Sequence, residues 1–216
     1  MKGGDLMNRY RKLVTFDWAI KKLLRSKANF GILEGFLSVL LKEEIKVLAI
    51  LESESNQKDR NDKFNRVDLK AENHKGEIII IEIQNDYEYD YLLRMAYGVS
   101  KAMTEHMNMG DEYSDIKKII SINIVYFDLG HGDDYVYHGF TNFIGIHKND
   151  ELQLTDAQKK EFGRERIRDL YPEYYILKVN GFDDYAKDTL DEWIYFLKNT
   201  EIKSSFRAPG LKEAAK

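Results

Sequence analysis

The nine residues GEIIIIEIQ at positions 76–84 decide the fold, because they join a near-continuous isoleucine run to a polar end. Such a run is typical of a central strand that is covered on both faces of a sheet. Side chains alternate between the two faces of a strand, so Glu82 and Gln84 point the same way. Because burying an unpaired charge is costly, a carboxylate and an amide at this position indicate that something binds them.

The residues before this strand predict a β-hairpin. Residues 64–71 alternate as a second strand, and a three-residue loop at 74–76 joins the two strands, with Gly76 at the left-handed position that such loops favour. In this register the numbers of paired residues sum to 150, so Asp68 faces Glu82. Directly opposed side chains have Cβ atoms about 5 Å apart.

Two carboxylates at that separation repel each other unless they share a proton or a cation. Mg²⁺ would relieve the repulsion, since it prefers a few carboxylates together with waters and phosphate oxygens. The alternative is that Asp68 pairs with Arg66 or Lys70 and that Glu82 is an isolated acid at an edge. The spacing alone leaves both interpretations open.

The rest of the chain alternates helical and extended patterns, which predicts an α/β fold with a central mixed β-sheet flanked by helices on both faces. Apolar spacing predicts helices over residues 15–25, 29–41, 91–109, 154–162 and 183–197. Extended patterns predict further strands over residues 46–52, 119–127, 135–147 and 174–179. We expect one domain over residues 1–198 and a polar C-terminal tail over residues 199–216, which could be the start of a truncated helical extension.

Composition excludes several classes of protein. With 43% hydrophobic and 12% aromatic residues, the chain is not disordered throughout. It has no cysteine, which excludes disulfides, cysteine-liganded zinc and a thiol nucleophile, and favours a reducing cytoplasm. The five histidines lack zinc-ligand spacing, and no apolar run is long enough to span a membrane. The net charge is −4, but the first thirty residues are basic and could either meet phosphate or form a solvated helix face.

The order and spacing of several segments resemble the PD-(D/E)XK nuclease superfamily, and within it the PD-(D/E)XK family transposases, also called recombination-promoting nucleases. The resemblance covers nearly the whole chain and implies a restriction-endonuclease-like core. Its segments are TFDWAIKK at 15–22, RVDLK at 66–70, GEIIIIEIQ at 76–84, RMAY at 94–97 with Lys101, LDEWIYFLK at 190–198 and SSFRAPGLK at 204–212.

This resemblance implies roles for four residues. Asp68 matches the first metal-binding acid and Glu82 the second. Gln84 stands where the superfamily usually has a lysine, and it can hold a water but brings no positive charge. Asp17 matches an acid that completes the site, although it could also be an acid that stabilises the first turn of a helix.

Cations on two predicted helices could meet DNA. Lys21 lies one turn after Asp17, and Lys22 could touch phosphate or be solvated. Arg94, Tyr97 and Lys101 share one helix face, which could look toward the metal site and the DNA backbone or simply toward solvent. Lys101 is our candidate for the positive charge that Gln84 lacks.

The resemblance therefore implies a DNA endonuclease that uses Mg²⁺, with Mn²⁺ able to substitute, and that acts in recombination or on mobile elements. We expect low sequence specificity, a cytoplasmic location, DNA as partner, no membrane association, and a chain that could form a homodimer. Two alternatives remain. One is a nuclease-derived DNA-binding module that has lost cleavage, and the other is a regulatory protein-interaction domain that uses the tyrosine-rich surface at residues 87–91.

Overall fold

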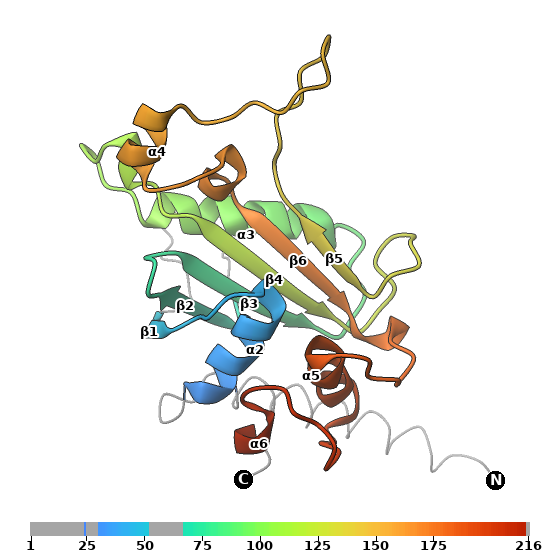
Figure 1. Ribbon diagram of the computed structural model, residues 1–216. Coiled ribbons are helices and arrows are strands. Elements are labelled where there is room, and N and C mark those ends of the chain that lie inside the picture. The colour runs from blue at the N-terminus through green and yellow to red at the C-terminus, as the bar shows by residue number, and fades with distance from the viewer. Residues whose placement is uncertain (1–23, 25–29, 52–66, 215–216) are drawn as a thin grey trace, which may run out of the picture.

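A six-stranded mixed sheet organises the computed structural model, which describes residues 24, 30–51 and 67–214 (Figure 1). The strand order is β1-β2-β3-β4-β6-β5, in which β3, β4 and β6 are parallel and the other pairings are antiparallel. The strands are β1 (Val47–Leu51), β2 (Leu69–Asn73), β3 (Ile78–Gln84), β4 (Ile119–Val125), β5 (Val136–Gly139) and β6 (Glu173–Lys178).

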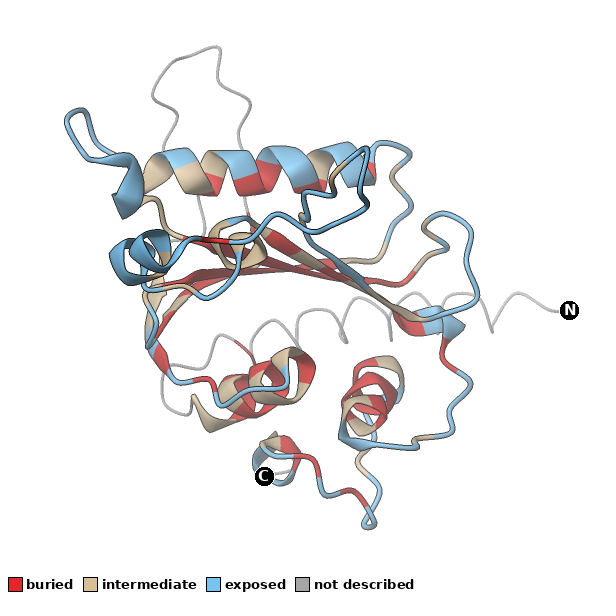
Figure 2. Cartoon of the chain, turned by 45° about the horizontal axis from the view of Figure 1, so that its top comes forward, coloured by how far each residue is buried: buried red, intermediate tan, exposed pale blue. Residues whose placement is uncertain are grey.

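Helices cover both faces of the sheet, which confirms the expected α/β architecture (Figure 2). Helix α3 (Tyr91–Glu105) lies on one face, and α2 (Gly31–Leu41), α5 (Thr189–Asn199) and α6 (Leu211–Ala214) lie on the other. A short helix, α4 (Asp156–Phe162), lies near the end of the sheet where β3, β4 and β6 begin. None of the helices in these ranges is long and apolar enough to cross a membrane.

The isoleucine run of β3 is buried on both sides, as its sequence predicts. The odd-numbered isoleucines from Ile79 to Ile83 join the large core beneath α2 and α5. Ile78 and Ile80 pack on the other face with Val99 and Ala102 of α3. Glu82 and Gln84 follow the even-numbered series and therefore belong to the α3 face of the sheet.

The hairpin has the predicted register. Leu69 pairs with Ile81 and Glu72 with Ile78, so the residue numbers of each pair sum to 150. The Gly76 backbone has a φ of +74°, and its N–H donates to the carbonyl of Asn73 at 2.9 Å. A glycine tolerates this left-handed conformation at no steric cost, which fixes the length of the loop.

Several elements differ from the sequence prediction at their ends, among them α3, α5 and β5. Helix α3 ends at Glu105, because the Asn108 N–H donates to the Asp111 carboxylate at 2.6 Å instead of continuing the helix. Helix α5 starts at Thr189, where Asp188 caps it by accepting the Asp191 N–H at 2.9 Å. Strand β5 stops at Gly139, because its partner strand β6 begins at Glu173.

The segment after residue 199, expected as a polar tail, returns to the core. Phe206, Ala208 and Leu211 are buried with α2 and α5, and the Trp193 indole donates to the carbonyl of Pro209 at 3.2 Å. The helix expected over residues 15–25 lies outside the described residues except for Leu24, which is buried in the same core.

Candidate functional site

The two acids of the predicted site lie at the open end of the β2–β3 hairpin. Asp68 lies one residue before β2, and its Oδ2 atom accepts the Ile83 N–H at 2.7 Å. In the hairpin register the backbone of Ile83 would pair with that of Val67. Backbone pairing stops before this position, and the Asp68 side chain accepts the Ile83 N–H instead. The register that pairs Leu69 with Ile81 would next set Asp68 opposite Glu82, and residues opposite each other in an antiparallel pair point to the same face of the sheet.

Arg94 from α3 reaches down to this pair. Its Nη2 atom lies 3.3 Å from Oε2 of the buried Glu82, and its Nη1 atom donates to Oε1 of Glu88 at 2.7 Å. Burial disfavours the charged guanidinium, but the carboxylates of Glu82 and Glu88 outweigh it and raise the pKa of Arg94 above its ordinary value. The site therefore holds a permanent cation that comes from the helix.

Gln84 is oriented by the loop that follows β3. Its Nε2 atom donates to the carbonyl of Asp86 and to Oε1 of Glu88, both at 3.1 Å. Because the amide nitrogen is held by the loop, the amide oxygen is the atom that is left to accept a hydrogen bond from water. Glu88 thus holds both Gln84 and Arg94. Sequence reasoning missed this role, and the only available signal was its position four residues after Gln84.

Tyr91 and Asn123 lie beneath the carboxylates. Asn123 of β4 pairs with Glu82 in the parallel register, and the Tyr91 hydroxyl donates to its Oδ1 atom at 3.2 Å. Burial raises the pKa of the Tyr91 phenol far above its ordinary value, and the charge of Glu82 adds to the effect. Tyr91 therefore stays protonated and cannot act as a general base.

The donor chemistry fits a hard divalent cation. Asp68 and Glu82 supply carboxylate oxygens from adjacent strands, and Mg²⁺ commonly takes one or two such ligands and fills its remaining positions with waters and phosphate oxygens. No group of three or more acids or histidines placed to hold a metal occurs among the described residues. Asp17, the acid expected to complete the site, lies outside them.

The predicted DNA contacts are placed in part. Tyr97 is exposed and Lys101 half-buried on α3, whereas Lys21 and Lys22 lie outside the described residues. At 1.5 Å per residue, Lys101 lies about 10 Å further along the helix axis than Arg94. Of the two cations, Arg94 is the one that contacts Glu82.

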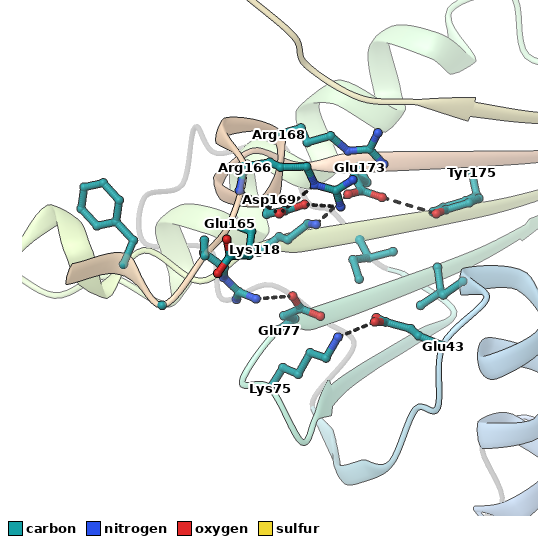
Figure 3. Close-up of a pocket in the computed structure, with 15 residues that line it drawn as sticks. Glu43, Lys75, Glu77, Lys118, Glu165, Arg166, Arg168, Asp169, Glu173 and Tyr175 are labelled. Carbon is teal, nitrogen blue, oxygen red and sulfur yellow. Dashed lines mark hydrogen bonds and ion pairs between the residues drawn. The ribbon is translucent and has the colours of Figure 1, made fainter. Parts of the chain in front are cut away.

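A cavity of about 640 Å³ lies at the opposite end of the sheet, where β3, β4 and β6 begin (Figure 3). Ion pairs cross its walls: Arg164 lies 2.9 Å from Glu77, and Lys118 lies 2.6 Å from Glu173. Figure 3 shows charged side chains from the hairpin loop and from the segment before β6 meeting around this space. Its paired acids and cations tie the end of the sheet together, away from Glu82.

Comparison with known proteins places the chain in a family. No curated protein and no solved structure matches it. The family model described as PD-(D/E)XK nuclease family transposase matches residues 14–210, a span that includes both strands of the hairpin, α3 and the C-terminal segment that packs on α2. The chain belongs to the PD-(D/E)XK nuclease family transposases.

Proposed function

We propose that this chain is a divalent-metal-dependent DNA endonuclease whose site is built on Asp68 and Glu82. The observation that carries the proposal is the hairpin register, which continues from Leu69 and Ile81 toward Asp68 and Glu82, together with Arg94 held 3.3 Å from Glu82. Family membership supports a nuclease associated with mobile elements. Mg²⁺ is the proposed cofactor, and Mn²⁺ should substitute for it.

Each residue would have a distinct task. Asp68 and Glu82 would hold the ion, which when bound activates water and shields the charge of a phosphodiester. The amide oxygen of Gln84 would accept a hydrogen bond from the attacking water and orient it. Arg94 would offer its guanidinium to the scissile phosphate, because a fixed cation aimed at developing negative charge stabilises the transition state.

Low sequence specificity forms part of the proposal. Charged side chains such as Arg94 and Lys101 pair with phosphates, and phosphate contacts carry no direct sequence information. The cysteine-free composition suits a reducing cytoplasm, where we propose that the protein meets its DNA.

Nicking of supercoiled plasmid tests the proposal. Asp68→Asn keeps an oxygen that can accept the Ile83 N–H but removes the charge, so it should abolish Mg²⁺- and Mn²⁺-dependent nicking while the thermal midpoint stays close to wild type. Glu82→Ala should also abolish nicking. Glu72→Gln is the matched control, because Glu72 lies on β2 and its side chain pairs instead with Lys117 at 2.7 Å. Normal cutting by either site variant would overturn the assignment.

A catalytically impaired DNA-binding module is the second candidate function. The feature that favours it is Gln84, which brings no charge to the position where the superfamily usually has lysine. Such a module would show salt-sensitive DNA binding but no nicking with Mg²⁺ or Mn²⁺ at any concentration of protein.

A further inference from the structure

A patch of exposed apolar side chains borders the proposed site. It comprises Tyr87, Tyr89, Leu92, Leu93 and Tyr97, from the loop after β3 and from α3. The Tyr89 side chain is 93% exposed and Leu93 is 73% exposed. Exposed apolar groups that lie together on a protein surface often mark binding sites, so this patch indicates a binding partner.

The patch adjoins residues of the site in the sequence. Tyr89 lies between Glu88, which contacts Arg94 and Gln84, and Asp90, whose carbonyl accepts the Leu93 N–H at 2.9 Å in the first turn of α3. Leu93 directly precedes Arg94 on the helix. A ligand that covers Tyr89 and Leu93 therefore lies within one helical turn of Arg94.

Tyr89 differs from the neighbouring tyrosines. The Tyr87 ring packs edge-on against Phe127, with ring centroids 5.5 Å apart, and Tyr91 is buried against the same phenylalanine. Within the described part of the chain, no ring contact, hydrogen bond or ion pair engages the Tyr89 side chain. One face of an aromatic ring is thus presented to solvent beside the site.

The charge around the patch selects the kind of group that can lie on it. Asp86 and Asp90 flank Tyr89 and are exposed, so they disfavour a phosphate directly over the loop, and a strand that lays a base on Tyr89 must turn its own phosphates away from these acids. The face of a nucleobase carries no net charge and stacks on tyrosine. In continuous duplex DNA the bases are stacked on one another behind two phosphate backbones, so only an unpaired base can reach this ring.

We infer that the patch is a stacking platform for unpaired bases, and that the substrate class is DNA with single-stranded character next to the scissile phosphate. This inference rests on the proposed function, because it takes the substrate to be DNA. Tyr89 supplies the stacking ring, and Leu93 extends the apolar surface. Base–aromatic stacking tolerates any base, which agrees with low sequence specificity.

Oligonucleotides of one sequence, offered as single strand, as duplex and as duplex with a single-stranded arm, test the inference. We expect wild type to cut unpaired regions fastest, and Tyr89→Ala to lower kcat/KM on them about tenfold, as expected for the loss of one base–aromatic stack, with duplex cutting unchanged. Tyr89→Phe should retain the wild-type rate. Tyr113→Ala is the matched control, because Tyr113 is 89% exposed in the separate turn Tyr113–Asp115.

A binding measurement separates this inference from the proposed function. In EDTA, a single strand that carries 2-aminopurine should lose fluorescence on binding to wild type and to Tyr89→Phe, but not to Tyr89→Ala. This result without cleavage under any metal would sustain the stacking platform for unpaired bases and overturn the proposed function. Equal binding of duplex and single strand, unaffected by Tyr89→Ala, would overturn the inference and leave the patch as a surface for a protein. An equal loss of kcat/KM by Tyr89→Ala on every substrate would overturn the inference as well.

Discussion

The guanidinium of Arg94 is clamped between two carboxylates, 3.3 Å from Glu82 and 2.7 Å from Glu88. This clamp brings a permanent positive charge to the end of β3, where Gln84 supplies none. A neutral residue at that position is therefore compatible with phosphodiester chemistry, provided that α3 delivers the cation.

Arg94→Gln should lower kcat for plasmid nicking by about a hundredfold and change DNA affinity much less, because a fixed cation at the phosphate acts mainly in the transition state. Lys101→Gln is the control on the same helix and should leave kcat near wild type. A larger loss from Lys101→Gln than from Arg94→Gln would transfer the role to Lys101.

Gln84→Leu should lower kcat about tenfold with little effect on DNA binding, since it removes one hydrogen bond to the attacking water without a change of charge. Gln84→Glu keeps an acceptor oxygen but places a second anion beside Glu88, which should release the loop and lower the rate further. Single-turnover cleavage measures both variants. Normal cleavage by Gln84→Leu would remove Gln84 from the mechanism.

Glu77→Gln should lower the free energy of unfolding by about 2 kcal/mol, because it leaves a partly buried arginine without its charge partner. The buried Glu77 carboxylate accepts from Arg164 at 2.9 Å and from the Asn73 amide at 2.8 Å. Urea unfolding measures the change. Glu72→Gln breaks a more exposed pair in the same hairpin and should cost less than about 1 kcal/mol. Equal decreases in the free energy of unfolding for Glu77→Gln and Glu72→Gln would contradict the role assigned to burial.

The stability of the protein should depend on the charge of Glu173. Burial opposes ionisation there, but the hydrogen bond from Lys118 at 2.6 Å and the contact with His138 outweigh it and hold the pKa of Glu173 below its ordinary value. A carboxyl whose pKa is lowered in the folded state adds stability above the unfolded-state pKa, about 4.3, and loses it as the pH falls through the folded value.

Glu173→Gln should therefore be less stable than wild type at pH 7, and the gap should shrink as the pH falls below about 4. Urea unfolding across this range measures the gap. Glu165→Gln is the control, because Glu165 lines the same cavity but is exposed. A gap that stays constant with pH would show that the carboxylate charge is not its source.

The sequence predicts the centre of the fold better than its margins. Alternation within residues 78–84 and a glycine at position 76 are local signals, and they determine both the buried faces of β3 and the hairpin register. The ends of α3 and α5 depend on which side chains cap the backbone. The Asn108 N–H bonds to Asp111 and Asp188 caps α5, and several nearby residues could have done the same.

For the candidate site, the sequence predicts how the two acids stand relative to each other, and their role as metal ligands stays a prediction. Asp68 and Glu82 become neighbours through strand register, which can be counted along the chain. The contact of Arg94 with Glu82 depends on how α3 crosses the sheet, which is set by the packing of Val99 and Ala102 on Ile78 and Ile80. No spacing within the sequence encodes that crossing, so the contact of Arg94 with Glu82 could not be predicted, and the positive charge assigned to Lys101 stays a prediction.

A change of length in the loop that ends at Gly76 should affect residues far from the loop. β3 is held by its parallel pairing with β4, so a residue inserted into or deleted from the loop at 74–76 must shift β2 instead. A shift of one residue turns every β2 side chain to the other face and carries Asp68 away from Glu82. A change in a surface turn about 20 Å from the acids would then have the phenotype of an active-site lesion.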